Sequence, residues 1–299
     1  MRPGTNPPAA ERQTIEGLSY ATLRSLGDWR DYVRESAPAL STRRQYEESL
    51  LGETRFVVHG NCYSCRSPVP FAVDYAYAYP IGGVLTPNWR EQLVCPRCVL
   101  NSRMRGALHL FEAILEPPRD ARILIAEQTT TFYRRLAAGY DNLIGFEYLA
   151  DEVPRGQPNA LGIRNESLTS LTFERQAFDH VLAFDVLEHI PDFRKALREC
   201  ARVLRPGGGL VMSVPFQLDA DEHVVRARYA DTGEIEHVLP PEYHGDPLNQ
   251  EGCLAFYYYG WRLLDDLTDA GFSSAVLCHF WSQEYCYLGM NQCLLIARK

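Results

Sequence analysis

The sequence lacks two features that would direct a chain into or across a membrane. It contains no run of about 18 apolar residues, so we expect no transmembrane helix. Residues 1–10 are rich in proline and have no apolar core, which argues against a signal peptide. We interpret them as a disordered leader and expect a cytoplasmic protein.

The sequence also lacks an excess of positive charge. Its formal net charge is −8, whereas a protein that binds nucleic acid without regard to sequence normally presents a basic face. The only candidate basic patch is Arg97, Arg103 and Arg105, which we interpret as a solvated face. The charge therefore argues against a nucleic-acid partner and favours a small-molecule substrate, or a group on a larger acceptor.

A disulfide framework is absent as well. Of the nine cysteines, four form two Cys-x2-Cys pairs and the others are scattered among apolar residues, as expected for buried thiols in a reducing compartment. The scattered cysteines are Cys200, Cys253, Cys278, Cys286 and Cys293.

The two cysteine pairs predict a metal site. Cys62 and Cys65 form one pair, and Cys95 and Cys98 form the other. Each pair can bring two thiolates to one side of a turn, and two such turns complete a tetrahedral zinc site. Four thiolates leave no open position, so the predicted zinc is structural, and a redox dithiol would need only one pair. We assign residues 56–103 to a small zinc-ribbon module, which leaves open that the ribbon also binds a protein partner.

The rest of the chain divides into two stretches. Residues 11–55 are polar with interrupted helical periodicity, and we expect a helical N-terminal extension. Residues 104–299 alternate strand and helix patterns, which is typical of a doubly wound α/β domain. Strands are expected at 121–126, 142–147, 163–168, 178–185, 209–215 and in two C-terminal segments, and helices near 130–138, 192–204 and from Trp261.

One segment carries a resemblance to a known family. Residues 178–216 read FDHVLAFDVLEHIPDFRKALRECARVLRPGGGLVMSVPF. This segment resembles the second half of class I S-adenosylmethionine-dependent methyltransferases. The resemblance implies a mostly parallel, seven-stranded Rossmann-like sheet over residues 104–299 and S-adenosylmethionine as cofactor. The chain is also similar to a bacterial subgroup with an N-terminal zinc ribbon and a Glu-Gln-x-Thr turn.

The resemblance implies the position of the cofactor site, but the turn after the first strand departs from the family. That turn is normally glycine-rich, and here it reads Glu127-Gln128-Thr129-Thr130. We expect Glu127 or Gln128 to hold the amino group of the methionine part and Thr129 or Thr130 its carboxylate. Glu147 would accept the ribose hydroxyls. The other expected contacts are Tyr148, Ser167, Leu168, Phe184 and Asp185. Alternatively, the pocket is lost and the domain is a scaffold.

The catalytic candidates follow the fourth strand. His189 can take a proton from an acceptor as the methyl group arrives, and Asp185 or Glu188 can orient it. A bolder alternative is a second metal held by these three residues and completed by His223 or His244.

Residues 218–252 form an insert in this domain. It contains nine acidic and two basic residues. By resemblance it caps the acceptor pocket, and its acidity favours a cationic or polyhydroxyl acceptor. Tyr243 and His244 are its first candidate pocket residues.

Together these observations predict a methyltransferase that acts on a small-molecule or glycan-like acceptor and carries a structural zinc site. Two alternatives stay open. One is an enzyme that uses the cofactor differently, for example by cyclising its aminoalkyl arm. The other is a non-catalytic adaptor with a degenerate pocket. The sequence does not determine the acceptor, the methylated atom or the oligomeric state.

Overall fold

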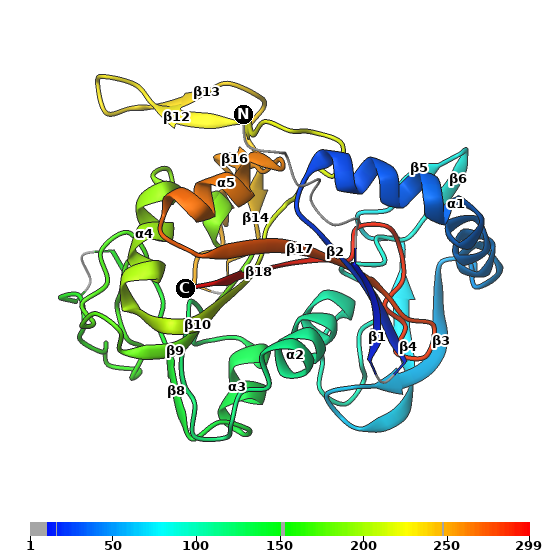
Figure 1. Cartoon of the computed structure of the whole chain (residues 1–299), viewed down its shortest axis with the longest axis horizontal. Helices are drawn as coiled ribbons and strands as arrows, with labels where there is room; N and C mark the ends of the chain where they lie inside the picture. The colour runs from blue at the N-terminus through cyan, green and yellow to red at the C-terminus, as the bar shows by residue number, and fades with distance from the viewer. Residues whose placement is uncertain (1–10, 16, 151–152, 247) are drawn as a thin grey trace, which may run out of the picture. The chain divides into compact units, whose positions relative to one another are not determined.

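A computed structural model describes residues 11–15, 17–150, 153–246 and 248–299 (Figure 1). The chain divides into two compact units, one of residues up to His109 with Leu277–Cys293, the other of Leu110–Val276 with Leu294–Lys299. The predicted leader at 1–10 lies outside the described residues. Among the helices that are described, none is long and apolar enough to cross a membrane.

The first unit begins with strands where we expected only helix. β1 (Glu11–Ile15) and β2 (Leu18–Leu23) pair antiparallel, and β17 (Ser274–Trp281) pairs with the other side of β2. The 24-residue helix α1 (Leu26–Ser49) follows, capped by the side chain of Ser25. The helical interpretation of 11–55 is therefore wrong for its first part. β2 lies between two strands and is buried on both faces, which hides the alternation typical of a strand.

The cysteine-containing segment is built on short hairpins. β3 (Arg55–Cys62) pairs antiparallel with β4 (Ser67–Asp74), and β5 (Tyr79–Ile81) pairs with β6 (Val84–Thr86). Alternate residues of β4 face a buried apolar cluster that includes Phe71 and Trp89. The helix α2 (Ser102–Leu115) follows this segment.

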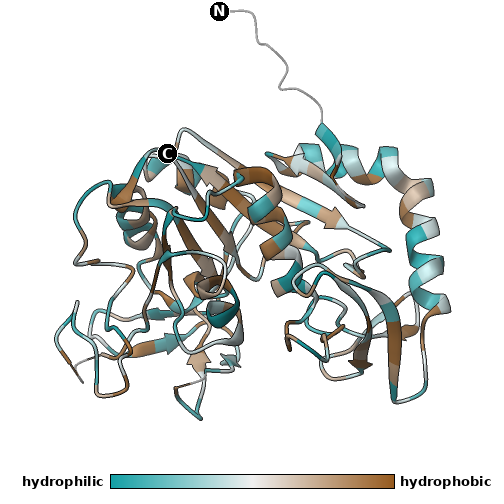
Figure 2. Ribbon diagram, turned by 90° about the horizontal axis from the view of Figure 1, so that it is seen from below, coloured by the Kyte–Doolittle hydropathy of each residue, from teal (hydrophilic) through white to brown (hydrophobic). Residues whose placement is uncertain are grey.

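The second unit is a parallel α/β sheet, as predicted. Its strand order is β8-β7-β9-β10-β18, and the first four are parallel while β18 is antiparallel to β10. Figure 2 shows hydrophobic residues concentrated on these strands. The bounds are β7 (Arg122–Ile125), β8 (Asn142–Gly145), β9 (Phe178–Phe184), β10 (Leu204–Ser213) and β18 (Cys293–Arg298). This arrangement confirms the Rossmann-like class.

The helices of this unit lie close to their predicted positions. They are α3 (Thr131–Ala137), α4 (Phe193–Val203) and α5 (Arg262–Asp269), with a short 3-10 turn η1 (Leu187–His189) after β9. The apolar positions of α4 are all buried, which confirms its predicted face.

In place of the strand expected at 163–168, the structure has two isolated bridges, a parallel one between Glu147 and Asn165 and an antiparallel one between Pro158 and Arg164. Backbone hydrogen bonds on both sides of Asn165 hold the segment. The side chain of Asn165 adds to them, because it accepts a hydrogen bond from the Leu149 N–H and donates to the carbonyls of Ala150 and Val153.

The insert at 218–252 and the residues after it form three small hairpin-like pairs. β11 (Val224–Val225) pairs with β16 (Tyr257–Tyr258), β12 (Ala227–Tyr229) with β13 (Ile235–His237), and β14 (Tyr243–His244) with β15 (Cys253–Leu254). The β14–β15 pair places His244 next to Cys253 in the ladder.

Candidate functional site

A single carboxylate organises the turn that follows β7. Oε1 of Glu147 accepts hydrogen bonds from the Gln128 N–H at 2.7 Å, the Thr129 N–H at 2.9 Å and the Thr129 hydroxyl at 2.8 Å. Glu147 follows β8, the strand beside β7. The carboxylate therefore satisfies backbone donors of a turn that contains no glycine.

The remaining side chains of this turn also have local partners. The Gln128 amide donates to the Gly162 carbonyl at 2.9 Å and accepts from the Arg164 N–H at 2.8 Å. The hydroxyl of Thr130 caps α3 by accepting from the Tyr133 N–H at 3.0 Å. Gln128, Thr129 and Thr130 thus define the shape of the turn, and their predicted contacts with a methionine moiety stay predictions.

A glycine on β8 allows the backbone of that strand to lie close to the turn after β7. A Cβ added to Gly145 would lie 2.4 Å from a ring carbon of Tyr133 and 2.8 Å from the Glu127 carbonyl oxygen. The turn itself has side chains at every position, so the space it needs is provided by β8. The sequence analysis did not identify this role of Gly145.

Hydrogen bonds of its own side chains hold the loop that is predicted to contact adenine. The Glu166 carboxylate is fully buried and accepts from the Arg164 guanidinium at 2.9 Å and the Thr172 N–H at 3.0 Å. Ser167 bonds the Thr169 hydroxyl at 2.9 Å. Leu168 is buried, whereas Tyr148, on the preceding loop, is 69% exposed.

Asp185 is held at the end of β9 in a left-handed conformation, with φ of 52°. Its Oδ1 accepts from the Ser213 hydroxyl at 2.9 Å, and its N–H donates to the Ser213 carbonyl at 2.9 Å. Phe184 packs edge-on against Phe132. A left-handed aspartate costs conformational energy that the bonds to β10 offset.

The structure brings together three of the predicted catalytic residues. Glu188, His189 and His244 each place one possible ligand atom within 4.8 Å of the others. Oε1 of Glu188 lies 3.5 Å from Nδ1 of His244 and 3.9 Å from Nε2 of His189. Charge and hydrogen bonding from Glu188, and then from Glu242, raise the pKa of His244.

Three other candidates lie outside this cluster. Asp185 bonds Ser213 instead, Tyr243 is 56% exposed, and His223 bonds Asp266 at 2.8 Å. Of the two histidines that we expected could complete a second metal site, His244 lies next to Glu188 and His189, and His223 does not. The sequence analysis missed Glu242, whose carboxylate lies 3.2 Å from Nε2 of His244. No local motif indicates that glutamate.

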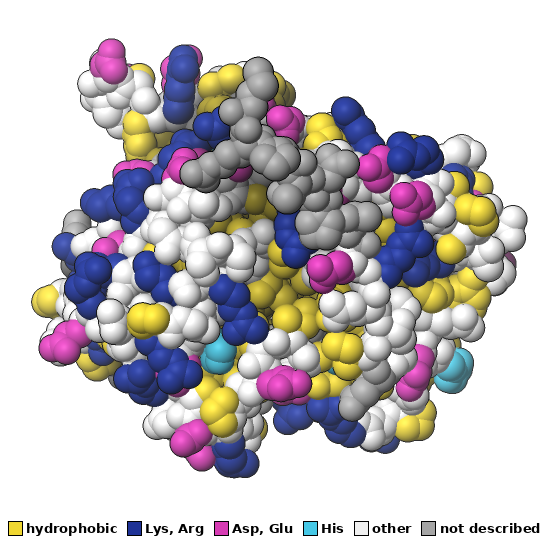
Figure 3. Space-filling model, in the orientation of Figure 1, with side chains coloured by type: hydrophobic (Ala, Val, Ile, Leu, Met, Phe, Trp, Pro, Cys, Tyr) yellow, Lys and Arg dark blue, Asp and Glu magenta, His cyan; other side chains and the backbone are white. Residues whose placement is uncertain are grey.

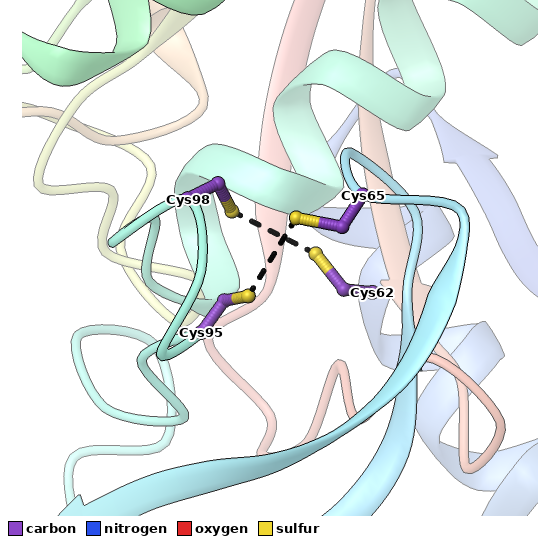
Figure 4. Close-up of side chains that lie close together, drawn as sticks. All are labelled: Cys62, Cys65, Cys95 and Cys98. Carbon is purple, nitrogen blue, oxygen red and sulfur yellow. Dashed lines mark hydrogen bonds between the residues drawn. The ribbon is translucent and has the colours of Figure 1, made fainter.

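The four paired cysteines converge, as their spacing predicts (Figure 4). The sulfurs of Cys62 and Cys98 are 3.7 Å apart, and those of Cys65 and Cys95 are 3.9 Å apart. Zinc–sulfur bonds of about 2.3 Å in a tetrahedron require sulfurs about 3.8 Å apart. The Arg97 N–H points to the Cys95 sulfur at 3.4 Å. These four residues can hold a tetrahedral metal ion.

Arg103 and Arg105 are not part of a solvated face, which corrects our interpretation of these two arginines, whereas Arg97 is exposed as expected. Arg105 is fully buried and donates to the carbonyls of Tyr285 at 2.7 Å and Leu93 at 3.1 Å. Arg103 donates to the Glu91 carboxylate at 3.0 Å. On the face shown in Figure 3, basic and acidic side chains are interspersed.

Comparison with known proteins agrees with the resemblance. Residues 130–212 match the family described as "Methyltransferase domain". The chain is 36% identical over 78 residues to a probable S-adenosylmethionine-dependent methyltransferase of Mycolicibacterium smegmatis, covering 25% of this chain and 30% of that one. It is 43% identical over 51 residues to a ubiquinone biosynthesis O-methyltransferase of Xanthomonas oryzae, covering 17% and 21%. The chain thus spans less than a third of the length of these relatives.

A solved structure, an S-adenosylmethionine-dependent methyltransferase from Mesorhizobium loti, aligns with 65% of this chain and 98% of its own. The sequence identity is 18% and the TM-score is 0.41.

Proposed function

Because residues 130–212 belong to the methyltransferase domain family, we propose that the protein is a class I S-adenosylmethionine-dependent methyltransferase with a small-molecule acceptor. The observation that carries this proposal beyond the family match is the convergence on Glu147. Its carboxylate holds the turn after β7 through Oε1, and it lies at the carboxyl end of the parallel sheet, where ligands bind in such folds.

In this proposal the two oxygens of Glu147 have different tasks. Oε1 keeps the turn in shape, and Oε2 accepts the ribose hydroxyls. The cofactor supplies an electrophilic methyl group on a sulfonium. The protein's contribution is to align an acceptor with that methyl group and to exclude water, and such positioning supplies much of the rate in bimolecular reactions.

We propose that the methyl acceptor binds beside the cluster of Glu188, His189 and His244. Burial and Asp246 raise the pKa of the half-buried Cys253 thiol to about 12, and the charges of Glu147 and Glu188 add to this effect. The carboxylate and imidazole groups of the cluster can accept the acceptor's proton as the methyl group is transferred.

We further propose that the four cysteines hold a structural zinc ion. The sulfur separations of 3.7 and 3.9 Å support this assignment. A glycan-like acceptor also belongs to the proposal, because the insert is acidic and such surfaces favour polyhydroxyl or cationic ligands over phosphates.

The decisive experiment is calorimetric binding of S-adenosylmethionine and S-adenosylhomocysteine to the zinc-loaded protein. We expect micromolar binding that weakens at least tenfold in Glu147→Gln, which keeps an oxygen for the turn but loses the charge. Glu234→Gln, at an exposed position, is the matched control and should bind normally. Absence of binding to the folded wild-type protein would contradict the proposal and favour the adaptor function.

A further inference from the structure

Glu188 is an unusual carboxylate. It lies in η1 with no exposed surface, and among the described residues neither of its oxygens has a close hydrogen-bond donor; Nδ1 of His244 lies 3.5 Å from Oε1. Burying an ionised group without partners costs several kcal/mol, so native proteins pair such groups or use them to bind a cation. The backbone at Glu188 is fixed in place, because its carbonyl accepts a hydrogen bond from the Phe256 N–H at 2.8 Å.

Two imidazole nitrogens point to this carboxylate. Nδ1 of His244 and Nε2 of His189 lie 3.5 and 3.9 Å from Oε1 of Glu188. Two ligand atoms that each lie about 2.0 to 2.2 Å from one ion can be at most about 4.3 Å apart. The two distances from Oε1 of Glu188 fall within that limit, and all three ligand atoms lie within 4.8 Å of one another.

The far side of each imidazole is held by an acceptor. Nδ1 of His189 lies 2.9 Å from the Leu254 carbonyl, which can only accept, so Nδ1 carries the proton and Nε2 has a free lone pair. Nε2 of His244 faces the Glu242 carboxylate at 3.2 Å, which leaves Nδ1 as the ligand atom. Such outer partners are typical of histidines that bind metals.

Glu242 is itself fixed in place. Its carboxylate pairs with Arg226 at 3.0 Å and accepts a hydrogen bond from the Tyr258 hydroxyl. The insert thus supplies His244, Glu242 and Arg226, while Leu254 and Tyr258 follow it in the chain. The hairpin pairs β14–β15 and β11–β16 hold these residues together.

We propose that Glu188, His189 and His244 bind a divalent transition-metal ion, distinct from the ion of the four-cysteine site. Two imidazoles and one carboxylate suit Mn²⁺, Fe²⁺, Co²⁺ or Zn²⁺. Three protein ligands leave open positions, as in catalytic rather than structural sites. Metal binding does not depend on the proposed function.

If the proposed function also holds, an acceptor oxygen at an open position would be oriented by the ion and made more acidic. In that state His189 is a ligand and not the proton acceptor.

The test is a titration of zinc-loaded protein with Mn²⁺, in which the loss of the free-ion electron paramagnetic resonance signal reports binding. Thiolates prefer softer ions, so the cysteine site does not compete. We expect one Mn²⁺ per chain, with affinity reduced at least tenfold in Glu188→Gln and in His244→Ala. His237→Ala, at an exposed position of the same insert, should bind as the wild type does.

Thermal unfolding provides a second measurement of metal binding. If Glu188 had only a structural role, Mn²⁺ would not change the melting temperature in the way described here. Mn²⁺ should raise the melting temperature of the wild type and leave that of Glu188→Gln unchanged, because only a folded site binds the ion. The metal-free melting temperature of each protein is its own reference, so any effect of Glu188→Gln on the metal-free protein does not enter the comparison.

Equal Mn²⁺ binding by wild type and both variants, or no binding by the wild type, would overturn the proposal. The second result would indicate that a protonated His244 neutralises Glu188 directly. Neither outcome bears on S-adenosylmethionine binding, which is measured separately, so failure of the metal site and failure of the proposed function are distinguishable.

Discussion

At the scale of single residues, the turn after β7 shows how side chains and backbone from different strands together shape one turn. The turn has no glycine, but it needs space and hydrogen-bond acceptors. Gly145 on the neighbouring strand supplies the space, and Glu147 supplies the acceptor. Both lie some twenty residues after the turn, so neither is evident from the turn's own sequence.

Replacement of Gly145 tests this division of tasks. In Gly145→Ala the added Cβ would meet the Glu127 carbonyl and the Tyr133 ring. We expect a loss of about 1 to 3 kcal/mol in the free energy of unfolding, as for other overpacked positions, and weaker S-adenosylmethionine binding. Urea unfolding and calorimetry measure the two effects. Gly139→Ala is the control, because a Cβ added there would lie 3.5 Å from the Leu136 carbonyl oxygen, an ordinary van der Waals contact. Equal destabilisation by both changes would refute the explanation.

At the scale of elements, two hairpins shape the cysteine segment, and we expect a metal ion bound by the four cysteines to hold it together. Cys62 ends β3, and the turn to β4 carries Cys65. The second pair, Cys95 and Cys98, follows the β5–β6 hairpin. Hydrogen bonding between the two sulfurs lowers the pKa of the Cys98 thiol and raises that of the Cys62 thiol, so the pair releases its first proton from Cys98.

We expect metal analysis to find one zinc ion per chain that survives dialysis against a chelator, which would also remove ions from any three-ligand site. Cys65→Ser should lose this zinc and unfold at lower temperature, since structural zinc contributes directly to folding. Cys200→Ala, which changes a buried cysteine in α4, should retain the zinc whatever its effect on stability. A stable, zinc-free wild-type preparation would contradict the site.

At the scale of the whole molecule, buried histidines are expected to make stability depend on pH. Burial lowers the pKa of His109, His180 and His279 to about 4 in each case. The unfolded chain takes up these protons near the ordinary value of about 6.5. Protons therefore favour the unfolded state as the pH falls from about 6.5 towards 4, and stability falls over that range.

His279 allows this prediction to be tested. It packs against Trp29 and Tyr32 and faces the Met290 carbonyl at 3.0 Å. Between pH 7.5 and 5.5, we expect His279→Gln to lose about 1 kcal/mol less in the free energy of unfolding than the wild type loses. Urea unfolding at both pH values measures this difference, and protonation of the zinc ligands affects both proteins alike. Identical losses would show that His279 does not titrate on unfolding.

Much of the architecture could be predicted from local patterns. The α4 face, the strands β7 to β10 and the convergence of the four cysteines follow from periodicity, punctuation and spacing, which depend on neighbouring residues. Two predictions failed for different reasons. β2 is buried on both faces, so it lacks the alternation of a half-exposed strand. The segment at 163–168, which we expected to be a strand, forms isolated bridges with the loops at Glu147 and Pro158, and this difference depends on how those loops fold.

The sequence by itself determined the fold class, the family resemblance and the residue types available for chemistry. Only the tertiary structure decided which of them meet. It joined His244 to Glu188 and His189 while directing His223 to Asp266, and it revealed Glu242 behind His244. The contacts of His244 with Glu188 and His189 join segments more than fifty residues apart, and their geometry depends on how the insert folds back onto η1, which no local pattern encodes.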